Sequence, residues 1–163
     1  MKKFLIQVVL LMVVIGIGIA FFIPGSTSTI SLPFLPQPTK TNELQINDAV
    51  FKVEVADTPE KRSKGLGGKE SLSDNEGMLF IFDKADRHTF WMKGLKFSLD
   101  FVWIKGDMVV DILENVPQPA QGQTDASLPI YTSKTEADKV LELKAGSVKK
   151  FNIKVGDSIK NKS

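Results

Sequence analysis

Polar side chains that could carry chemistry lie inside the most aromatic segment of the chain, residues 76–104. Arg87, His88, Lys93 and Asp100 occur there among five of the eleven Phe and both Trp. Aromatic side chains bury large areas, so a segment this rich in them marks the core of a small domain. A core strand has no need of such closely spaced charges. We therefore expect polar groups to converge beside the core.

Two carboxylates, Glu76 and Asp100, flank the aromatic residues of this segment. A pair of carboxyls that faces one cleft can act as acid and base on a glycosidic bond. Each also has a structural use, since Glu76 can accept backbone N–H groups beside Gly77 and Asp100 can pair with Arg62 or Lys93. The structural role is favoured. A hydrolase of cell-envelope material, with Glu76 and Asp100 as the catalytic pair, is the alternative function.

A binding site fits the composition of this segment better than a catalytic one. Trp91 and its aromatic neighbours can line an apolar groove, and a few charged groups can stand at its mouth, which is the usual make-up of a ligand pocket. The predicted ligand-binding residues are Arg62, Trp91, Lys93 and Asp100. Alternate residues of a strand point to opposite faces, so either Phe90 or Trp91 belongs to the core.

Other chemistries have little support in the sequence. A triad built on His88 and Asp100 lacks the pattern that surrounds a nucleophilic Ser. One His, no Cys and no spaced carboxylates give no zinc shell, and no metal or cofactor is predicted. The chain has 21 basic and 19 acidic residues, and two of its Lys precede the apolar N-terminal run. The remainder is balanced in charge, which argues against binding to nucleic acid.

Short strands dominate the rest of the chain. Phe51, Val53 and Val55 alternate with polar or small residues, as in a half-buried strand. A two-turn helix is expected from Pro59 to Gly65, capped by Asp57 or Thr58. Further strands are expected at 78–82, 88–92, 99–104, 108–113, 140–143 and near 158–159, with a short helix after Ser147. The predicted fold is a compact, β-rich α+β domain with a curled or barrel-like sheet and one or two short helices.

A membrane helix is expected before this domain. After Lys2 and Lys3, residues 4–23 are almost wholly apolar, and twenty helical residues span about 30 Å, the thickness of the hydrocarbon core. Residues 1–23 are interpreted as an anchor or signal sequence, 24–42 as a Pro/Ser/Thr-rich tether and 43–163 as the domain. The lysines place the domain outside the cytoplasm, where it would be secreted if the anchor were cleaved.

The exported part resembles domain-of-unknown-function family 192 from about Phe51 to Ile159. The resemblance rests on blocks in the same order as in the family, including 76–80 (EGMLF), 90–93 (FWMK), 99–100 (LD) and 140–143 (VLEL). It implies a small bacterial or archaeal protein, often exported, with a compact β-rich fold and no established activity. The chain departs from the family pattern at Gly67, Lys69 and Gly94-Leu95, where Met, Arg and Asn-Thr are usual.

The sequence thus predicts a non-catalytic binding or accessory module of the cell envelope. Its expected partners are the membrane, through the N-terminal helix, and an envelope glycan, peptide or protein. A purely structural role would show a flat apolar patch in place of a pocket. The loop at 116–131 is a further candidate for function, because long loops without regular structure are uncommon in compact domains.

Overall fold

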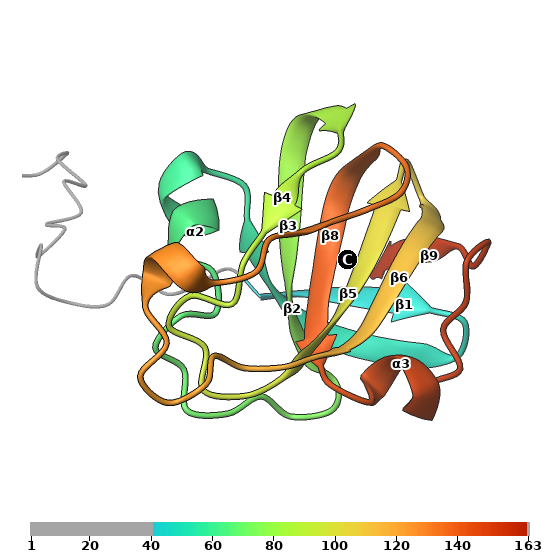
Figure 1. Cartoon of the computed structure of the whole chain (residues 1–163). Coiled ribbons are helices and arrows are strands. Elements are labelled where there is room, and N and C mark those ends of the chain that lie inside the picture. Colours follow the sequence, from blue (N-terminus) through green and yellow to red (C-terminus); the bar gives the residue numbers. More distant parts are fainter. Residues whose placement is uncertain (1–40, 163) are drawn as a thin grey trace, which may run out of the picture. The chain divides into compact units, whose positions relative to one another are not determined.

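The computed structural model describes residues 41–162 of the chain (Figure 1). The predicted membrane helix at 1–23 and nearly all of the predicted tether at 24–42 lie outside these residues. In the part that the structure describes, no helix is long and apolar enough to cross a membrane.

The described residues contain nine strands and two short α-helices. The strands are β1 (Thr41–Ile46), β2 (Ala49–Ala56), β3 (Glu76–Asp86), β4 (Thr89–Phe90), β5 (Leu99–Lys105), β6 (Met108–Val116), β7 (Tyr131–Thr132), β8 (Ala137–Lys144) and β9 (Ile159–Lys162). The helices are α2 (Pro59–Lys64) and α3 (Ser147–Lys150), and a 3-10 turn, η1 (Asp125–Ser127), lies in the long loop. The predicted β-rich α+β class is confirmed.

Seven strands form one sheet in the order β6-β5-β8-β3-β2-β1-β9, and β4 pairs with β7 in a separate ribbon. Neighbouring strands of the large sheet run antiparallel except β2 and β3, which are parallel. Parallel neighbours require a crossover connection. That connection contains α2 and the glycine-rich loop after it, which is how these segments come to cover one face of the sheet.

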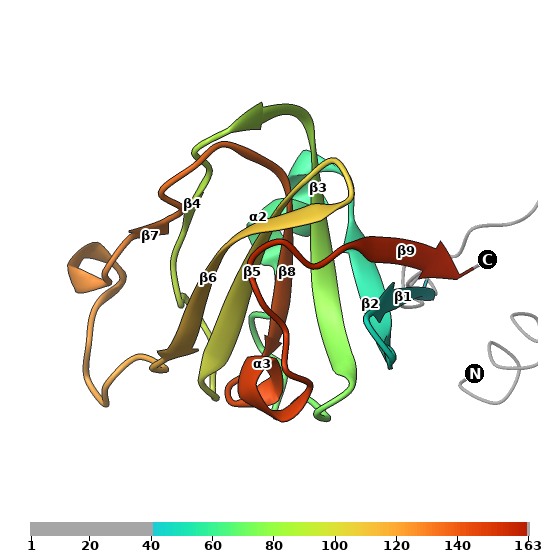
Figure 2. The ribbon, with the colours of Figure 1, turned by 90° about the vertical axis from the view of Figure 1, so that its right-hand side faces the viewer.

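The large sheet is curled but does not close into a barrel. The edge strand β6 approaches the start of β9 through an isolated bridge between Met108 and Ser158, the residue before β9. The Val109 N–H also donates to the Asp157 carbonyl at 2.9 Å. In Figure 2 the segment that leads into β9 passes beside the hairpin between β5 and β6. Of the two forms that the sequence allowed, the curled one is found.

The curled sheet has a hydrophobic core on each face, and β5 contributes to both. All six residues from Leu99 to Ile104 are fully buried. Val102 and Ile104 belong to the core that also contains residues of β1, β2 and α3. Phe101 and Trp103, two residues apart, belong to the core on the other face. A strand buried on both faces does not alternate between apolar and polar residues.

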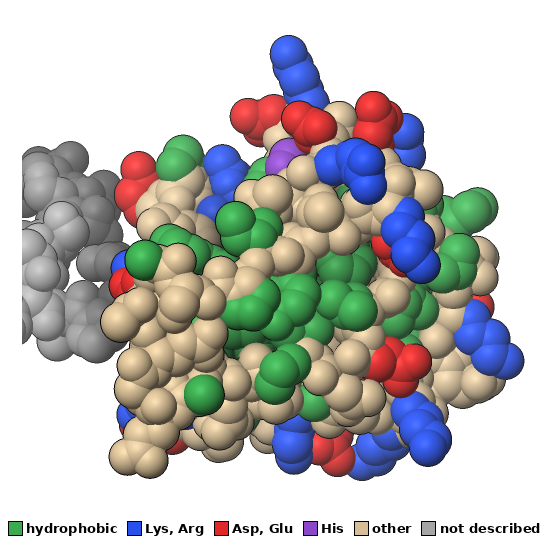
Figure 3. Space-filling view, viewed as in Figure 1, with side chains coloured by type: hydrophobic (Ala, Val, Ile, Leu, Met, Phe, Trp, Pro, Cys, Tyr) green, Lys and Arg blue, Asp and Glu red, His purple; other side chains and the backbone are tan. Residues whose placement is uncertain are grey.

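The second core is built on four aromatic residues, Phe80, Phe90, Phe101 and Trp103, and is called the aromatic core below. The Phe80 and Phe90 rings meet edge to face with centroids 5.1 Å apart, and Phe90 lies 5.6 Å from Phe101. Phe90 is buried while Trp91 is 49% exposed, so the first of the two alternatives for this strand is confirmed. Figure 3 shows hydrophobic side chains in the middle of this face, over β8 and β5, with charged ones along its top, right and bottom edges.

The short helix α2 begins and ends where the sequence predicts. Thr58 is its N-cap residue: the Thr58 hydroxyl accepts a hydrogen bond from the Lys61 N–H at 3.3 Å, and Pro59 occupies the first turn. Gly65 ends the helix with φ of 51°, a backbone conformation that glycine adopts without the steric cost of a Cβ. The chain can therefore turn sharply from α2 into the loop that borders the aromatic core.

Candidate functional site

A cavity of about 240 Å³ opens beside the aromatic core, between the end of α2 and the segment after β4. Its lining combines an apolar interior with a few charged side chains, as in small-molecule sites generally. The residues that line it are Arg62, Ser63, Lys64, Gly65, Leu66, Gly67, Phe80, Phe90, Trp91, Lys93, Gly94, Leu95 and Glu142. Three of the four predicted binding residues, Arg62, Trp91 and Lys93, therefore line one cavity, and Asp100 does not.

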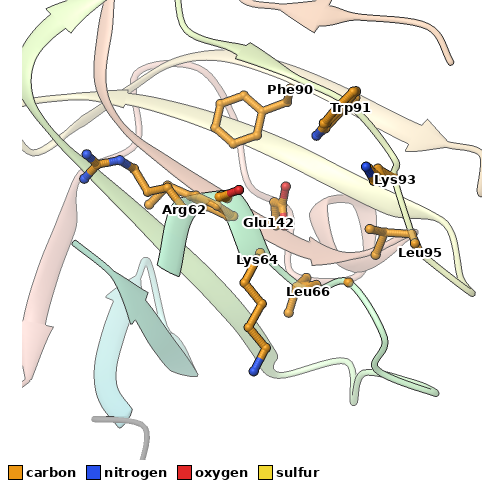
Figure 4. A pocket seen from close by; sticks show the side chains of 13 residues that line it. Arg62, Lys64, Leu66, Phe90, Trp91, Lys93, Leu95 and Glu142 are labelled. Carbon is orange, nitrogen blue, oxygen red and sulfur yellow. The ribbon is translucent and has the colours of Figure 1, made fainter. Parts of the chain in front are cut away.

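Glu142 of β8 supplies the carboxyl group of this cavity. It lies opposite Phe101 of β5 and Met78 of β3 in the sheet, so its side chain shares a face with the aromatic core. Only 4% of the residue is exposed. In Figure 4 its carboxyl points toward the middle of the labelled side chains. A carboxyl in this position can contact a ligand that binds in the cavity.

The Glu142 carboxyl has no hydrogen-bond or ion-pair partner among residues 41–162. Burial alone raises its pKa from the ordinary 4.5 to about 8, because removal from water disfavours the charged form. At neutral pH the group is therefore mostly protonated. Carboxyls with strongly shifted pKa values concentrate at functional sites, so Glu142 is a candidate functional residue of this cavity.

Close packing of β3 against β8 holds the Glu142 backbone in place. Gly77 pairs with Leu143 in this ladder, and a Cβ on Gly77 would lie 2.6 Å from the Glu142 carbonyl oxygen. Only a glycine permits the two strands to approach this closely. The sequence Glu76-Gly77 at the start of β3 therefore has a structural reason that is independent of ligand binding.

Two loops form the side wall of the cavity and are joined directly. The Gly68 N–H donates to the Gly94 carbonyl at 3.0 Å. A Cβ on Gly94 would lie 3.7 Å from the Gly67 Cα, which shows how near the two backbones run. The glycine-rich loop after α2, with the buried Leu66, and the segment after β4 thus form one wall.

Trp91 and Lys93 form the rim of the cavity together with the long loop. The Lys93 Nζ lies 5.2 Å from the centroid of the Trp91 ring and 2.7 Å from a carboxylate oxygen of Asp125 in η1. The ammonium is thereby held over the indole ring, a favourable cation–π arrangement. The predicted functional loop is therefore in contact with the site, through Asp125.

The predicted binding residue Arg62 lines the cavity with its stem, while its guanidinium is engaged elsewhere. The guanidinium donates to the backbone carbonyls of Asp57 at 3.0 Å and Ile81 at 2.9 Å and lies over the Phe82 ring at 5.2 Å. Figure 4 shows it extending away from Glu142. These contacts fix the end of α2 to β3.

Asp100 and Glu76 lie away from the cavity. Asp100 is fully buried and accepts hydrogen bonds from the backbone N–H of Asn115 at 2.8 Å and of Val148 at 2.9 Å. Glu76 is exposed and accepts from the Ser73 N–H at 3.1 Å, a bond that holds its pKa below the usual range. Each carboxylate therefore has the backbone partner that a structural role requires.

The remaining candidates have ordinary surroundings. His88 stacks on the Phe82 ring with centroids 3.5 Å apart, and its Nε2 lies 3.2 Å from the Lys84 carbonyl oxygen. Across residues 41–162, no three His, Cys, Asp or Glu side chains are grouped closely enough to hold a metal ion.

Sequence reasoning missed Glu142 as a site residue. The signal was present, because Glu142 stands between apolar residues in 140–143 (VLEL), in a strand whose neighbours are buried on both sides. A carboxylate is rarely buried without a partner. The position of Glu142 in such a strand could therefore have identified it as a candidate site residue.

Comparisons with known proteins agree with this fold. A solved structure from Sinorhizobium meliloti 1021, described as a candidate transcription regulator, is 26% identical to this chain, with a TM-score of 0.67 over 76% of this chain and 95% of that one. Another, from Novosphingobium aromaticivorans DSM 12444 and of unknown function, is also 26% identical, with a TM-score of 0.64 over 75% and 84%. Comparison with curated proteins gives no match.

The family model of domain-of-unknown-function family 192, described as Uncharacterized ACR, matches residues 42–161. This match covers the whole of the large sheet and both of its cores except for the first and last residues of the sheet. The chain therefore belongs to domain-of-unknown-function family 192.

Proposed function

We propose that this protein is a non-catalytic binding module of the cell envelope, which takes a small organic ligand into the cavity above Glu142. One observation carries the proposal: Glu142, a residue that is only 4% exposed, directs a carboxyl without a partner among the described residues into an aromatic-lined cavity. Burying a polar group without a hydrogen bond costs roughly 1–3 kcal/mol in proteins. A ligand that supplies the missing bond offsets this cost on binding.

The composition of the cavity favours binding over the hydrolase alternative. A glycosidase of the common type needs two carboxyls within one cleft. Of the described residues that line the cavity, Glu142 alone carries a carboxyl, while Glu76 and Asp100 are held by backbone N–H groups. The walls instead offer Phe80 and Phe90 as apolar surface and Trp91 as an exposed ring at the rim.

The place of the module in the cell is proposed from the N-terminal sequence. Two lysines followed by twenty mostly apolar residues favour an anchor with the domain outside the cytoplasm. The chain has no Cys, so a single exposed Lys149→Cys variant reports its side of the membrane. Labelling of intact cells by a membrane-impermeant maleimide is expected. Labelling only after lysis would place the domain inside and contradict the proposal.

A thermal-shift screen of the purified full chain in detergent tests the binding function. The panel contains envelope glycans, peptides, nucleotides, metal ions, and small amines, alcohols and carboxylic acids. We expect at least one compound class to raise the melting temperature in a saturable way. Removing the rim indole with Trp91→Ala should weaken that compound about tenfold, the usual effect of losing an aromatic contact at a binding site.

The matched control is Val155→Ala, which truncates another exposed apolar residue, 61% exposed, at a position that does not line the cavity. It should leave the affinity unchanged. If no compound shifts the melting temperature, or if every shift survives in Trp91→Ala, the cavity is not a ligand site.

A further inference from the structure

The cavity contains a buried carboxyl whose surroundings provide no positive charge to pair with it. Burial is the sole cause of its raised pKa, with no contribution from a neighbouring cation. The lack of a contribution from a cation is unexpected, because three basic residues, Arg62, Lys64 and Lys93, also line the cavity. The positions of their charged groups explain why none of them pairs with Glu142.

Each of the three basic side chains directs its charge away from Glu142 or shares it with another group. The Arg62 guanidinium donates to the backbone carbonyls of Asp57 and Ile81. The Lys93 ammonium is paired with Asp125 at 2.7 Å. Lys64 is exposed, and in Figure 4 its ammonium extends away from the carboxyl. Met78 and Phe101, which flank Glu142 on the neighbouring strands, carry no charge.

We infer that the ligand of this cavity carries an ammonium group, which forms an ion pair with the Glu142 carboxylate while its hydrocarbon part packs against Phe80 and Phe90. The inference rests on the proposed binding function and names the chemical class of ligand for the same site. It follows from the juxtaposition of one unpaired carboxyl with aromatic walls, because a carboxylate attracts a cation and aromatic rings attract a cation at their faces.

Other ligand classes use fewer of these features. An anion would meet the Glu142 carboxyl in the cavity, while Arg62 and Lys93 already have partners and the Lys64 ammonium extends away. A neutral hydroxyl can hydrogen-bond to Glu142 but forms no ion pair with its carboxylate. The cavity, at about 240 Å³, is smaller than the roughly 300–1,000 Å³ of sites for drug-sized ligands. The ligand is therefore a small amine, of the size of one substituted ring.

Binding of such a ligand has a defined proton balance. The free site holds Glu142 mainly as the neutral acid below its pKa of about 8, and an aliphatic amine remains an ammonium ion across this range. Forming the ion pair converts the acid to the carboxylate and releases one proton to the solvent. The apparent affinity therefore rises with pH, by about tenfold per unit below the pKa of Glu142.

Matched pairs of ligands that differ only in their polar group test the inference. Benzylamine is compared with benzyl alcohol, and cyclohexylamine with cyclohexanol, by isothermal titration of the purified full chain in phosphate buffer. We expect each amine to bind at least tenfold more tightly than its alcohol at pH 7.5. We also expect the amine affinity to rise about tenfold between pH 6 and pH 7.

Two isosteric variants assign the effect to Glu142. Glu142→Gln keeps the shape of the side chain but cannot ionise, so it should abolish the preference for the amine and the pH dependence. Glu76→Gln is the control, because Glu76 is an exposed carboxylate that does not line the cavity, and it should leave both unchanged. The pH dependence of the unmodified chain decides the question even if Glu142→Gln fails to fold.

The outcomes separate the two proposals. Equal or tighter binding of the alcohols, with loss of binding in Trp91→Ala, would overturn the ammonium inference and leave the binding function standing. The inference also falls if neither amine binds, or if amine affinity is flat or falls between pH 6 and pH 7. Failure of every class in the thermal-shift screen would remove the binding function itself.

Discussion

A substitution at Asp100 tests whether this carboxylate stabilises the fold, as its hydrogen bonds indicate. The fully buried Asp100 accepts one bond from the Asn115 N–H at 2.8 Å and one from the Val148 N–H at 2.9 Å. It thereby joins the end of β6 to the start of α3. A hydrogen bond to a charged group contributes about 1.5–3 kcal/mol, and a buried donor left without an acceptor costs its full desolvation.

Asp100→Ala removes both acceptors at once, so we expect a loss of about 3–6 kcal/mol in the free energy of unfolding. This is a large part of the 5–15 kcal/mol typical of a domain. Asp100→Asn keeps one carbonyl acceptor and turns an N–H₂ donor toward the other amide. It should therefore be less destabilising than Ala, with a loss of at least about 1.5 kcal/mol for the missing bond.

Urea unfolding monitored by fluorescence measures these losses, because Trp103 is fully buried and reports the state of the core. Native-state hydrogen exchange provides a local measure, in which the Asn115 and Val148 amides should exchange faster than other amides of β6 and α3. An unchanged urea midpoint in Asp100→Ala would refute this reasoning. If that variant also lost ligand binding, Asp100 would return to the functional role that the sequence first suggested.

Three further changes have effects of predictable sign. Gly77→Ala should destabilise the domain by about 1–3 kcal/mol in thermal or urea unfolding, because the new Cβ would force a backbone carbonyl 2.6 Å away to move. Asp74→Asn should lower the unfolding midpoint slightly at pH 7 and not at pH 2, since Lys150 and Lys144 hold the pKa of Asp74 at about 2, and its stabilisation is lost as pH falls from 3.8 through that value. Added salt should shrink the effect. The third change is Glu142→Gln. Relative to this variant, the unmodified chain should lose about 1.4 kcal/mol of unfolding free energy per pH unit as pH rises from 4.5 to about 8, because its folded state retains a proton that the unfolded state releases. Parallel curves of stability against pH for the two proteins would contradict this.

Local sequence patterns predicted most of the fold. The strand at 99–104 and the helix from Pro59 to Gly65 were identified from apolar residues and capping signals, and they are found as β5 and α2. The strand expected at 78–82 is longer, because β3 resumes its pairing with β8 at Asp86 after a register shift. The one expected at 88–92 shrinks to Thr89–Phe90. Pairing partners, which no local pattern specifies, set both lengths.

The site was only partly predictable, because strand pairing also decides which residues lie at the cavity. Trp91 and Lys93 were identified as site residues because aromatic side chains with a few charged groups at the mouth are the usual make-up of a ligand pocket, and both line the cavity. Asp100 was grouped with them, yet it is adjacent in sequence to Phe101 and points to the opposite face of β5. Glu142 follows Phe101 by forty-one residues in the sequence, and only the pairing of β8 with β5 brings the two residues opposite each other.

The most direct test of the account is the titration of the Glu142 carboxyl itself. In carbon-13 NMR of the full chain, the carboxyl resonance of this residue is the one that disappears in Glu142→Gln, and its chemical shift can be followed from pH 4 to pH 10. We expect a midpoint near 8, because the buried acid has no partner in the free protein. A midpoint close to the ordinary 4.5 would show that the carboxyl is hydrated or paired, and neither the cavity site nor its ammonium ligand would then have a basis.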